Sequence, residues 1–405
     1  MDLRLNFRTN RFLSIYVIFI LIVGYLIIHI FNGRFIMYDF AVYYKAANRI
    51  ASGQNLYQIV EDGHAIFKYS PVSAIYFIPF QWLSFPVAKL LYWICSGIAV
   101  CFVLLLIYRI AGLGMRTLTA GQHNLYIMIS FIVLGAFLEL EIHLGQVNIF
   151  ILLSLLISLI YSMKNKPAQA GLALAISIFL KPFGLILAAW YAYRMKYKEV
   201  VYFIMFLAIL FFLPLIFYRS FDMFAGQNKY WFKEIITELN TKQDLLAPRN
   251  HTLFSVQVRY TPLRWLDWNA QLTLIYQLFV LMILGLLMIK LNKAGKEDEW
   301  SPAGELGLLL CLIPLLAFTN RNLYIFNGLA SAILLIRFRS LDWTHKTFFI
   351  LGIMISSFNI IEIWGEHITY LQEDWSFITI GTMMIWVVLY LNIYRSTLIF
   401  KRAQR

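Results

Sequence analysis

Asp39 is the only acidic residue between Arg34 and Tyr57, a stretch rich in tyrosine, arginine and lysine. A carboxylate in such a setting can act as a general base, because it can take a proton from a hydroxyl group. Asp is also a favoured residue for capping the start of a helix. The competing interpretation is therefore structural, with Asp39 capping a helix that begins at Phe40, and the two roles are compatible.

Further polar side chains gather where hydrophobic segments end. Each could be an ordinary solvated loop residue, but a carboxylate beside an apolar segment needs a partner or water. Cations from four separate loops are expected on the same side of the molecule as these groups. In addition to Asp39, the candidate site residues are Tyr43, Tyr44, Glu141, His143, Gln146, Asn148, Lys181, Asn250, His251, Arg259, Arg321 and Asn322.

The composition indicates what kind of scaffold must position these residues. The chain has 405 residues, of which 61% are hydrophobic and only 14% are charged, whereas soluble domains carry about 25% charged residues. Several apolar runs reach the ~20 residues that cross a bilayer as a helix. We therefore expect an all-α polytopic membrane protein. The net charge of +13 fits basic cytoplasmic loops and anionic lipid headgroups better than nucleic-acid binding, because no basic soluble module is visible.

The hydrophobic pattern predicts a single membrane domain over residues 1–405, with both basic termini in the cytoplasm. Long loops at 32–85 and 219–270 are then external, and their aromatic, amphipathic segments predict helices lying in the membrane interface on the active-site side. About ten full spans are expected, at 11–31, 86–108, 124–142, 145–163, 200–218, 271–290, 303–319, 322–338, 345–363 and 376–394.

The stretch "AQAGLALAISIFLKPFGLILAAWYAYRMKYK" does not fit this scheme as full spans. Basic residues flank it on both sides, and it is too short for two crossings. A hairpin of two half-helices that turns at Lys181–Pro182 satisfies both constraints, because proline breaks a helix. An ionisable residue at membrane depth is a functional candidate, although Lys181 could instead reach toward headgroups or cap a helix end.

Five stretches resemble, in order, the pattern of glycosyltransferase family 87, which comprises polyprenol-phosphate-mannose-dependent mannosyltransferases and their relatives. They are "DFAVYYKAANRIASGQNLY", "YSPVSAIYFIPF", "GQVN" (145–148), "AGLALAISIFLKP" and "NHTLFSVQVR". His251 stands where that family usually has Gln, and the family's paired histidines near the tenth span are replaced by "TNRNLYIF", in which Asn322 is the nearest candidate. The resemblance implies the integral-membrane C-type glycosyltransferase fold.

The resemblance also implies a chemistry in which one carboxylate suffices. Glycosidases need a second carboxyl group to protonate a poor leaving group, whereas a polyprenyl-phosphate sugar leaves as a phosphate monoester that is stable without a proton. Asp39 would be the catalytic base of an inverting transfer. The active site would lie on the external (periplasmic) face of the cytoplasmic membrane. Lys181, Arg259 and Arg321 would bind the donor phosphate, although Arg259 could instead anchor a helix to headgroups. The residues expected to bind the substrates are Tyr43, Tyr44, Glu141, His143, Gln146, Asn148, Asn250, His251 and Asn322.

The implied partners are a polyprenyl-phosphate sugar donor, a glycan or glycolipid acceptor, and membrane lipids. We expect no cofactor and no metal, because the carboxylates of Glu139 and Glu141 lack further ligands at suitable spacing. The expected role of one of them is to bind the acceptor sugar or to orient a cation.

Two alternatives compete with a mannosyltransferase. A lipid-linked sugar transporter or flippase would be expected to carry internal repeats with paired broken helices, and only the Lys181–Pro182 break is visible. An O-antigen ligase or polymerase shares the lipid-linked donor, but its donors are usually oligosaccharides on pyrophosphate. The ordered motifs favour the mannosyltransferase interpretation.

Overall fold

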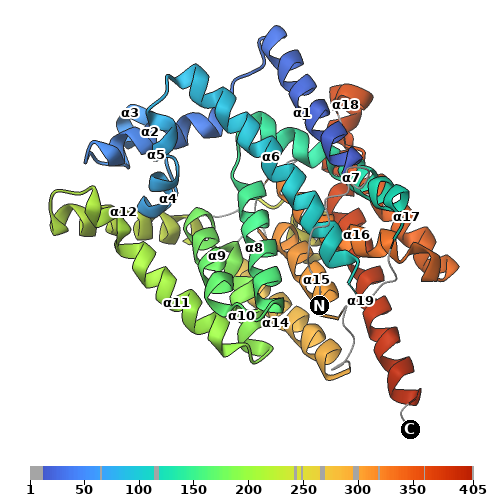
Figure 1. Cartoon of the computed structure of the whole chain (residues 1–405). Helices are drawn as coiled ribbons and strands as arrows, with labels where there is room; N and C mark the ends of the chain where they lie inside the picture. The colour runs from blue at the N-terminus through green and yellow to red at the C-terminus, as the bar shows by residue number, and fades with distance from the viewer. Residues whose placement is uncertain are drawn as a thin grey trace. The chain divides into compact units, whose positions relative to one another are not determined.

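The computed structural model describes residues 12–63, 66–113, 118–240, 244–247, 250–264, 270–294, 301–317, 320–359 and 361–403. Within these ranges all regular secondary structure is helical (Figure 1). The basic N-terminal segment before residue 12 and the end of the C-terminal "FKRAQR" lie outside the described residues, so the predicted location of the termini stays a prediction.

The chain divides into two compact units, each assembled from separate stretches of sequence. The first comprises Met1–Ile18, Leu104–Glu139 and Lys242–Arg405, and the second comprises Phe19–Val103 and Leu140–Thr241. Three long helices contribute residues to both units, namely α1 (Leu13–Phe31), α6 (Phe85–Ala111) and α7 (Ala120–Leu144). The prediction of a single membrane domain stays a prediction.

The second unit contains the first long loop, the broken hairpin and the helices beside them. Its further elements are α2 (Tyr38–Ala51), α3 (Ile59–Asp62), α4 (Pro71–Tyr76), α5 (Ile78–Gln81), α8 (Asn148–Met163), α9 (Pro167–Leu180), η2 (Pro182–Gly184), α10 (Leu185–Tyr193), α11 (Tyr197–Phe212), η3 (Leu213–Ile216) and α12 (Phe221–Asn240).

Helix α2 is amphipathic, with Phe40, Tyr43, Ala47 and Ile50 buried at helical spacing. It is fastened to α3 by a two-pronged ion pair, in which Arg49 Nη1 and Nη2 lie 2.5 and 2.9 Å from the carboxylate oxygens of Asp62. Beyond α2, the backbone N–H of Leu56 donates to the side chain of Gln227 in α12. The predicted external segment 32–85 is therefore joined within this unit to α12, the first part of the predicted external segment 219–270.

The predicted reversal at Lys181–Pro182 is present. Lys181 has extended backbone angles (φ −151°, ψ 144°) between α9 and η2. The Ser158 hydroxyl of α8 donates to the carbonyl of Ala170 near the start of α9, at 2.9 Å, and also lies 2.9 Å from the Tyr191 hydroxyl near the end of α10. Because Ala170 and Tyr191 meet at the same serine, α9 and α10 must run in opposite directions. These helices lie beside α8 and α11 (Figure 1).

The first unit is built from the C-terminal third of the chain together with parts of α1, α6 and α7. Its further elements are α13 (Leu253–Tyr260), α14 (Ala270–Ala294), α15 (Ser301–Leu316), η5 (Arg321–Asn327), α16 (Gly328–Ile336), η6 (Phe338–Ser340), α17 (Trp343–Ser357), α18 (Ile361–Asp374) and α19 (Phe377–Ala403). Side chains at two helix starts accept backbone N–H bonds, from Ser255 to Thr252 at α13 and from His345 to Asp342 at α17.

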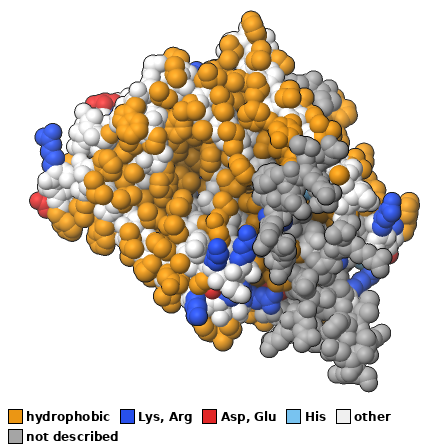
Figure 2. Space-filling model, viewed as in Figure 1, with side chains coloured by type: hydrophobic (Ala, Val, Ile, Leu, Met, Phe, Trp, Pro, Cys, Tyr) orange, Lys and Arg blue, Asp and Glu red, His pale blue; other side chains and the backbone are white. Residues whose placement is uncertain are grey.

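Six helices of the described part are long and apolar enough to cross a membrane, namely α1, α6, α7, Tyr197–Ile216, α14 and α19. This confirms the all-α polytopic membrane class. Other predicted spans coincide with shorter helices, α8, α15, η5 with α16, and α17, so the count of about ten stays a prediction. Apolar side chains cover most of the described face in Figure 2, as expected of a surface solvated by lipid tails.

Candidate active site

Asp39 lies in the first turn of α2, one residue inside the helix. The helix begins at Tyr38, and its N-cap is Met37, which has a left-handed backbone (φ 55°) and makes no side-chain capping bond. The interpretation of Asp39 as the N-cap of a helix starting at Phe40 is therefore wrong, because the helix starts two residues earlier. A carboxylate in the first turn is still favoured by the helix dipole.

The "GQVN" segment, residues 145–148, brings an amide to this carboxylate. Gly145 has a positive φ of 71°, and a Cβ atom there would lie 2.8 Å from Cβ of Phe40. Only glycine allows the segment to adopt this turn so close to the start of α2. The result is a hydrogen bond of 2.6 Å from Gln146 Nε2 to Asp39 Oδ2.

The same segment also holds a cation. Lys181 Nζ donates to Asn148 Oδ1 at 2.9 Å. The buried carboxylate of Glu141 accepts from Asn148 Nδ2 at 2.8 Å and from the backbone N–H of Ile149 at 2.9 Å. Glu141 therefore fixes the side-chain amide of Asn148 so that its oxygen faces the lysine, which corresponds to the cation-orienting role expected of one of the two glutamates.

Asp39 and Lys181 are close enough to affect each other electrostatically. Burial is the largest influence on the pKa of Asp39 and raises it above 3.8, while the hydrogen bond from Gln146 and the positive charge of Lys181 oppose that rise. Desolvation strengthens a carboxylate as a base, and the two opposing contacts keep the ionised form accessible. A carboxylate and a cation thus share one polar cluster.

Three tyrosines are connected to this cluster. Tyr43, four residues after Asp39, is buried, and its hydroxyl lies 3.0 Å from the hydroxyl of Tyr69. Tyr92 donates to the backbone carbonyl of Gln146 at 2.9 Å. By contrast, the Tyr44 hydroxyl is engaged by the Leu83 carbonyl at 2.7 Å, which indicates a structural anchor.

Sequence reasoning missed Tyr69 and Tyr92 as members of this site. Tyr92 lies within a predicted span, where a tyrosine is expected to be an ordinary packing residue between helices. Tyr69 opens the family-like stretch "YSPVSAIYFIPF", which was a usable signal.

His143 contacts a second histidine. Its Nδ1 atom lies 3.3 Å from Nδ1 of His29, and their rings are 5.0 Å apart in an edge-to-face arrangement. Tyr25 and Trp93 flank the ring of His29. This pair links α1 to the end of α7 within the second unit.

The remaining candidates belong to the first unit, in which Arg321 forms a buried polar centre. Arg321 is buried and donates to Asn359 Oδ1 at 2.6 Å. It also lies 3.6 Å from a carboxylate oxygen of Glu139 and 3.7 Å from one of Glu373. Two carboxylates thus already compensate its charge.

Arg259 is occupied by protein carbonyls. Its guanidinium donates to the backbone oxygens of Glu373, Asp374 and Ala247, at 3.0, 2.9 and 2.6 Å, and also contacts Leu246 O and Ser376 Oγ. These bonds tie α13 to the loop before it and to the end of α18. The geometry favours an anchoring role, and phosphate binding by Arg259 stays a prediction.

Asn250 and His251 organise the entry to α13. Asn250 donates to the carbonyl of Asp244 and accepts from the backbone N–H and hydroxyl of Thr252. The backbone oxygen of His251 accepts from Tyr324 and Thr379. Burial, aided by the charges of Arg259 and Arg321, lowers the pKa of His251 to about 3. The last candidate, Asn322, is buried in η5.

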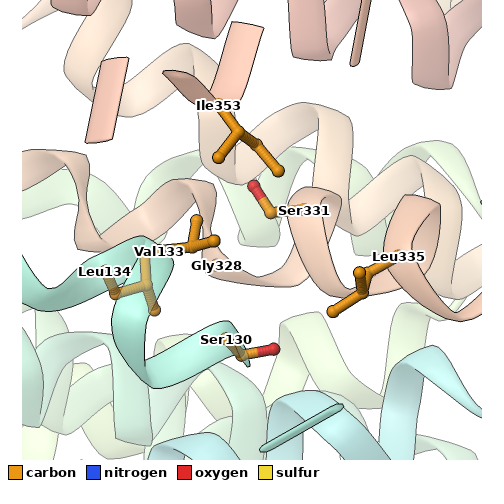
Figure 3. Close-up of a pocket in the computed structure, with 7 residues that line it drawn as sticks. All are labelled: Ser130, Val133, Leu134, Gly328, Ser331, Leu335 and Ile353. Atoms are coloured by element: carbon orange, nitrogen blue, oxygen red, sulfur yellow. The ribbon is translucent and has the colours of Figure 1, made fainter. Parts of the chain in front are cut away.

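A small pocket in the first unit contains none of the predicted site residues. It is lined by Ser130, Val133, Leu134, Gly328, Ser331, Leu335 and Ile353 (Figure 3). Its volume of about 10 Å³ accommodates one water at most. The Ser331 hydroxyl has no hydrogen-bond partner among the described residues, which such a water would supply.

Among the described residues, no three histidine, cysteine, aspartate or glutamate side chains gather as a metal site requires. The arrangement in the second unit, a carboxylate held by an amide beside a lysine, is instead suited to removing a proton close to a developing negative charge.

The model of one known family, glycosyltransferase family 87, matches residues 67–316, well over half of the chain. No curated protein and no solved structure matches the chain.

Proposed function

The chain belongs to glycosyltransferase family 87, and from this premise we propose that it transfers mannose from a polyprenyl-phosphate donor to a lipid-linked or glycan acceptor. Family membership makes it a glycosyltransferase that acts on a sugar donor and an acceptor, and its apolar helices make it a membrane protein. The proposal adds the donor, the sugar, inversion at the anomeric carbon, and a site on the external face of the cytoplasmic membrane. It also adds the C-type arrangement of the helices.

In this reaction the acceptor hydroxyl oxygen attacks C1 of the donor sugar from the face opposite the phosphate. The Asp39 carboxylate takes the hydroxyl proton as the new C1–O bond forms. The old bond from C1 to the phosphate oxygen breaks, and its electron pair leaves with the polyprenyl phosphate. The charge on that phosphate grows from about −1 toward −2, so a cation placed beside it stabilises the transition state more than the ground state.

The observation that carries the proposal is the convergence of Asp39 and Lys181 on the "GQVN" segment. Gln146 binds the carboxylate at 2.6 Å and Asn148 binds the ammonium at 2.9 Å. Two residues of one short turn thus position a base and a phosphate-binding cation. Arg321 and Arg259 remain secondary candidates for the phosphate, because protein carboxylates and carbonyls already occupy them.

The test uses the purified full chain in detergent with three radiolabelled donors, polyprenyl-phosphate mannose, glucose and arabinose, and a lipid extract as the acceptor. We expect transfer from the mannose donor and a product whose anomeric configuration is opposite to that of the donor. A retained configuration would exclude the single-displacement mechanism. Movement of the donor across reconstituted vesicles without any sugar product would favour the transporter alternative.

A further inference from the structure

Three tyrosines are connected to the Asp39 cluster, Tyr43 and Tyr92 directly and Tyr69 through the hydroxyl of Tyr43, and they differ in their access to solvent. Tyr43 and Tyr92 are each about 1% exposed, whereas Tyr69 is only partly buried. Tyr92 uses its hydroxyl proton in a bond to the carbonyl of Gln146. Tyr43 and Tyr69 face each other with their oxygens 3.0 Å apart, and two hydroxyl protons are available to this pair.

Only one of these two protons can lie between the two oxygens. Tyr43 has no water to bond, because it is buried, and a buried hydroxyl proton without an acceptor is costly. Tyr43 is therefore the donor and Tyr69 the acceptor. Burial also raises the pKa of Tyr43, so its hydroxyl keeps its proton. The proton of Tyr69 must then point away from Tyr43, and Tyr69 is partly exposed, so that proton is free to bond a ligand.

The backbone of Tyr69 is fixed on both sides. The Tyr57 hydroxyl donates to the Tyr69 carbonyl at 2.8 Å. The adjacent Ser70 caps α4 and donates its hydroxyl proton to the carbonyl of Phe179, two residues before Lys181. Tyr69 is thus held between the α2 side of the site, which carries the base, and the α9 end, which carries the cation.

We propose that the Tyr69 hydroxyl is a substrate-binding group that donates a hydrogen bond to a sugar hydroxyl beside Asp39. This inference rests on the proposed function and extends it to the recognition of the sugar. Lys181 supplies charge for the phosphate, whereas Tyr69 offers a neutral donor and a partly exposed aromatic ring, the combination that suits a sugar better than an anion. The sugar is that of the donor or that of the acceptor.

The test compares Tyr69→Phe with the wild type in steady-state kinetics on the purified full chain, using polyprenyl-phosphate mannose and a lipid-extract acceptor. One arm varies the donor at fixed acceptor, and the other varies the acceptor at fixed donor. We expect KM for one of the two to rise roughly two- to tenfold, as for loss of a neutral hydrogen bond. The melting temperature should fall modestly, because the ring is kept but the buried Tyr43 hydroxyl loses its acceptor. Tyr69→Leu should have a larger effect on the same substrate.

Tyr76→Phe is the matched control, because the Tyr76 hydroxyl in α4 is buried and has no hydrogen-bond partner in the described structure. It should leave both KM values unchanged. Wild-type kinetics in Tyr69→Phe, or a lowered melting temperature without a change in KM, would assign Tyr69 to packing and overturn the inference alone. Absence of transfer by the wild type with all three donors would overturn the proposed function and this inference together.

Discussion

Asp39 combines two properties that a base in a membrane enzyme needs: partial burial, which raises its pKa, and an amide that keeps its carboxylate in place. Exchanging Asp39 for Asn changes one oxygen to an amide nitrogen and removes the basicity without changing the shape. We predict that Asp39→Asn lowers kcat by roughly 100- to 10,000-fold, the range for loss of a general base, while the melting temperature stays near that of the wild type. Asp222→Asn, at an exposed carboxylate in α12, is the control. Undiminished turnover in folded Asp39→Asn would remove Asp39 from the mechanism.

The pH profile gives a second test at the same residue. The base must be ionised, so kcat/KM should fall as the pH drops through the pKa of Asp39, which burial places above 3.8. Lys181 opposes that rise, so removing its charge lets the pKa climb further. In Lys181→Gln, the acidic limb of the residual activity should therefore move to higher pH. A limb that stays in place would mean that Lys181 does not act on the ionising group.

His251 connects protonation to stability. Its pKa is 6.5 when unperturbed and about 3 in the folded chain, so between these values the unfolded chain binds a proton that the folded chain does not. The free energy of unfolding therefore does not depend on the protonation of His251 above about pH 6.5. It decreases as the pH falls from there toward 3, by up to about 1.4 kcal/mol per pH unit. His251→Gln should flatten the fall of melting temperature between pH 7 and pH 4.5, whereas the exposed His367→Gln should not. Parallel curves for His251→Gln and the wild type would contradict this assignment.

At the scale of elements, the hairpin of α9 and α10 depends on close packing against α11. A Cβ atom at Gly171 would lie 2.6 Å from the backbone nitrogen of Phe203, and backbone cannot yield as a flexible side chain can. We predict that Gly171→Ala lowers stability by about 1–3 kcal/mol, the usual cost of overpacking. In α12, Gly226 has nothing within 4 Å of such an atom, so Gly226→Ala should be neutral or stabilising by up to about 1 kcal/mol. Thermal unfolding of both variants checks the pair, and equal melting temperatures would refute the close approach.

The turn at residues 145–148 shows how an element creates a site that neither helix contains. Gly145 permits the approach to Phe40, and the residues that follow at alternate positions bind Asp39 and Lys181. The motif was visible in the sequence, and Gln146 and Asn148 were among the candidate site residues. The structure adds a different use, because both side chains hold protein groups, namely the carboxylate proposed as the base and the lysine proposed to bind phosphate.

At the scale of the whole molecule, the hairpin fixes the topology downstream of it. The residues that flank the hairpin are adjacent, since Nζ of Lys196, which follows α10, lies 2.8 Å from Oγ of Ser162, which precedes α9. Cysteines placed at Lys166 and Lys196, in a background with Cys95, Cys101 and Cys311 replaced, should both react with an impermeant reagent from the cytoplasmic side only. A cysteine at Gln54, which follows α2, should react from the external side. Labelling of positions 166 and 196 from opposite sides would contradict the hairpin.

The sequence by itself determined the membrane class, the break at Lys181–Pro182 and the resemblance to the family. These follow from local properties: runs of apolar residues, a proline without an N–H, and short motifs in a fixed order. Asp39 could also be singled out, because a lone carboxylate among cations is conspicuous. Only the tertiary structure decided which cations accompany it. Lys181 and Arg259 looked equivalent in the sequence, yet Lys181 meets the Asp39 cluster through Asn148, whereas carbonyls surround Arg259. Tyr69 became visible for the same reason, since the contact of its hydroxyl with Tyr43 joins residues 26 positions apart. The partners of a side chain depend on how helices pack, and the spacing of residues along the chain does not contain that information.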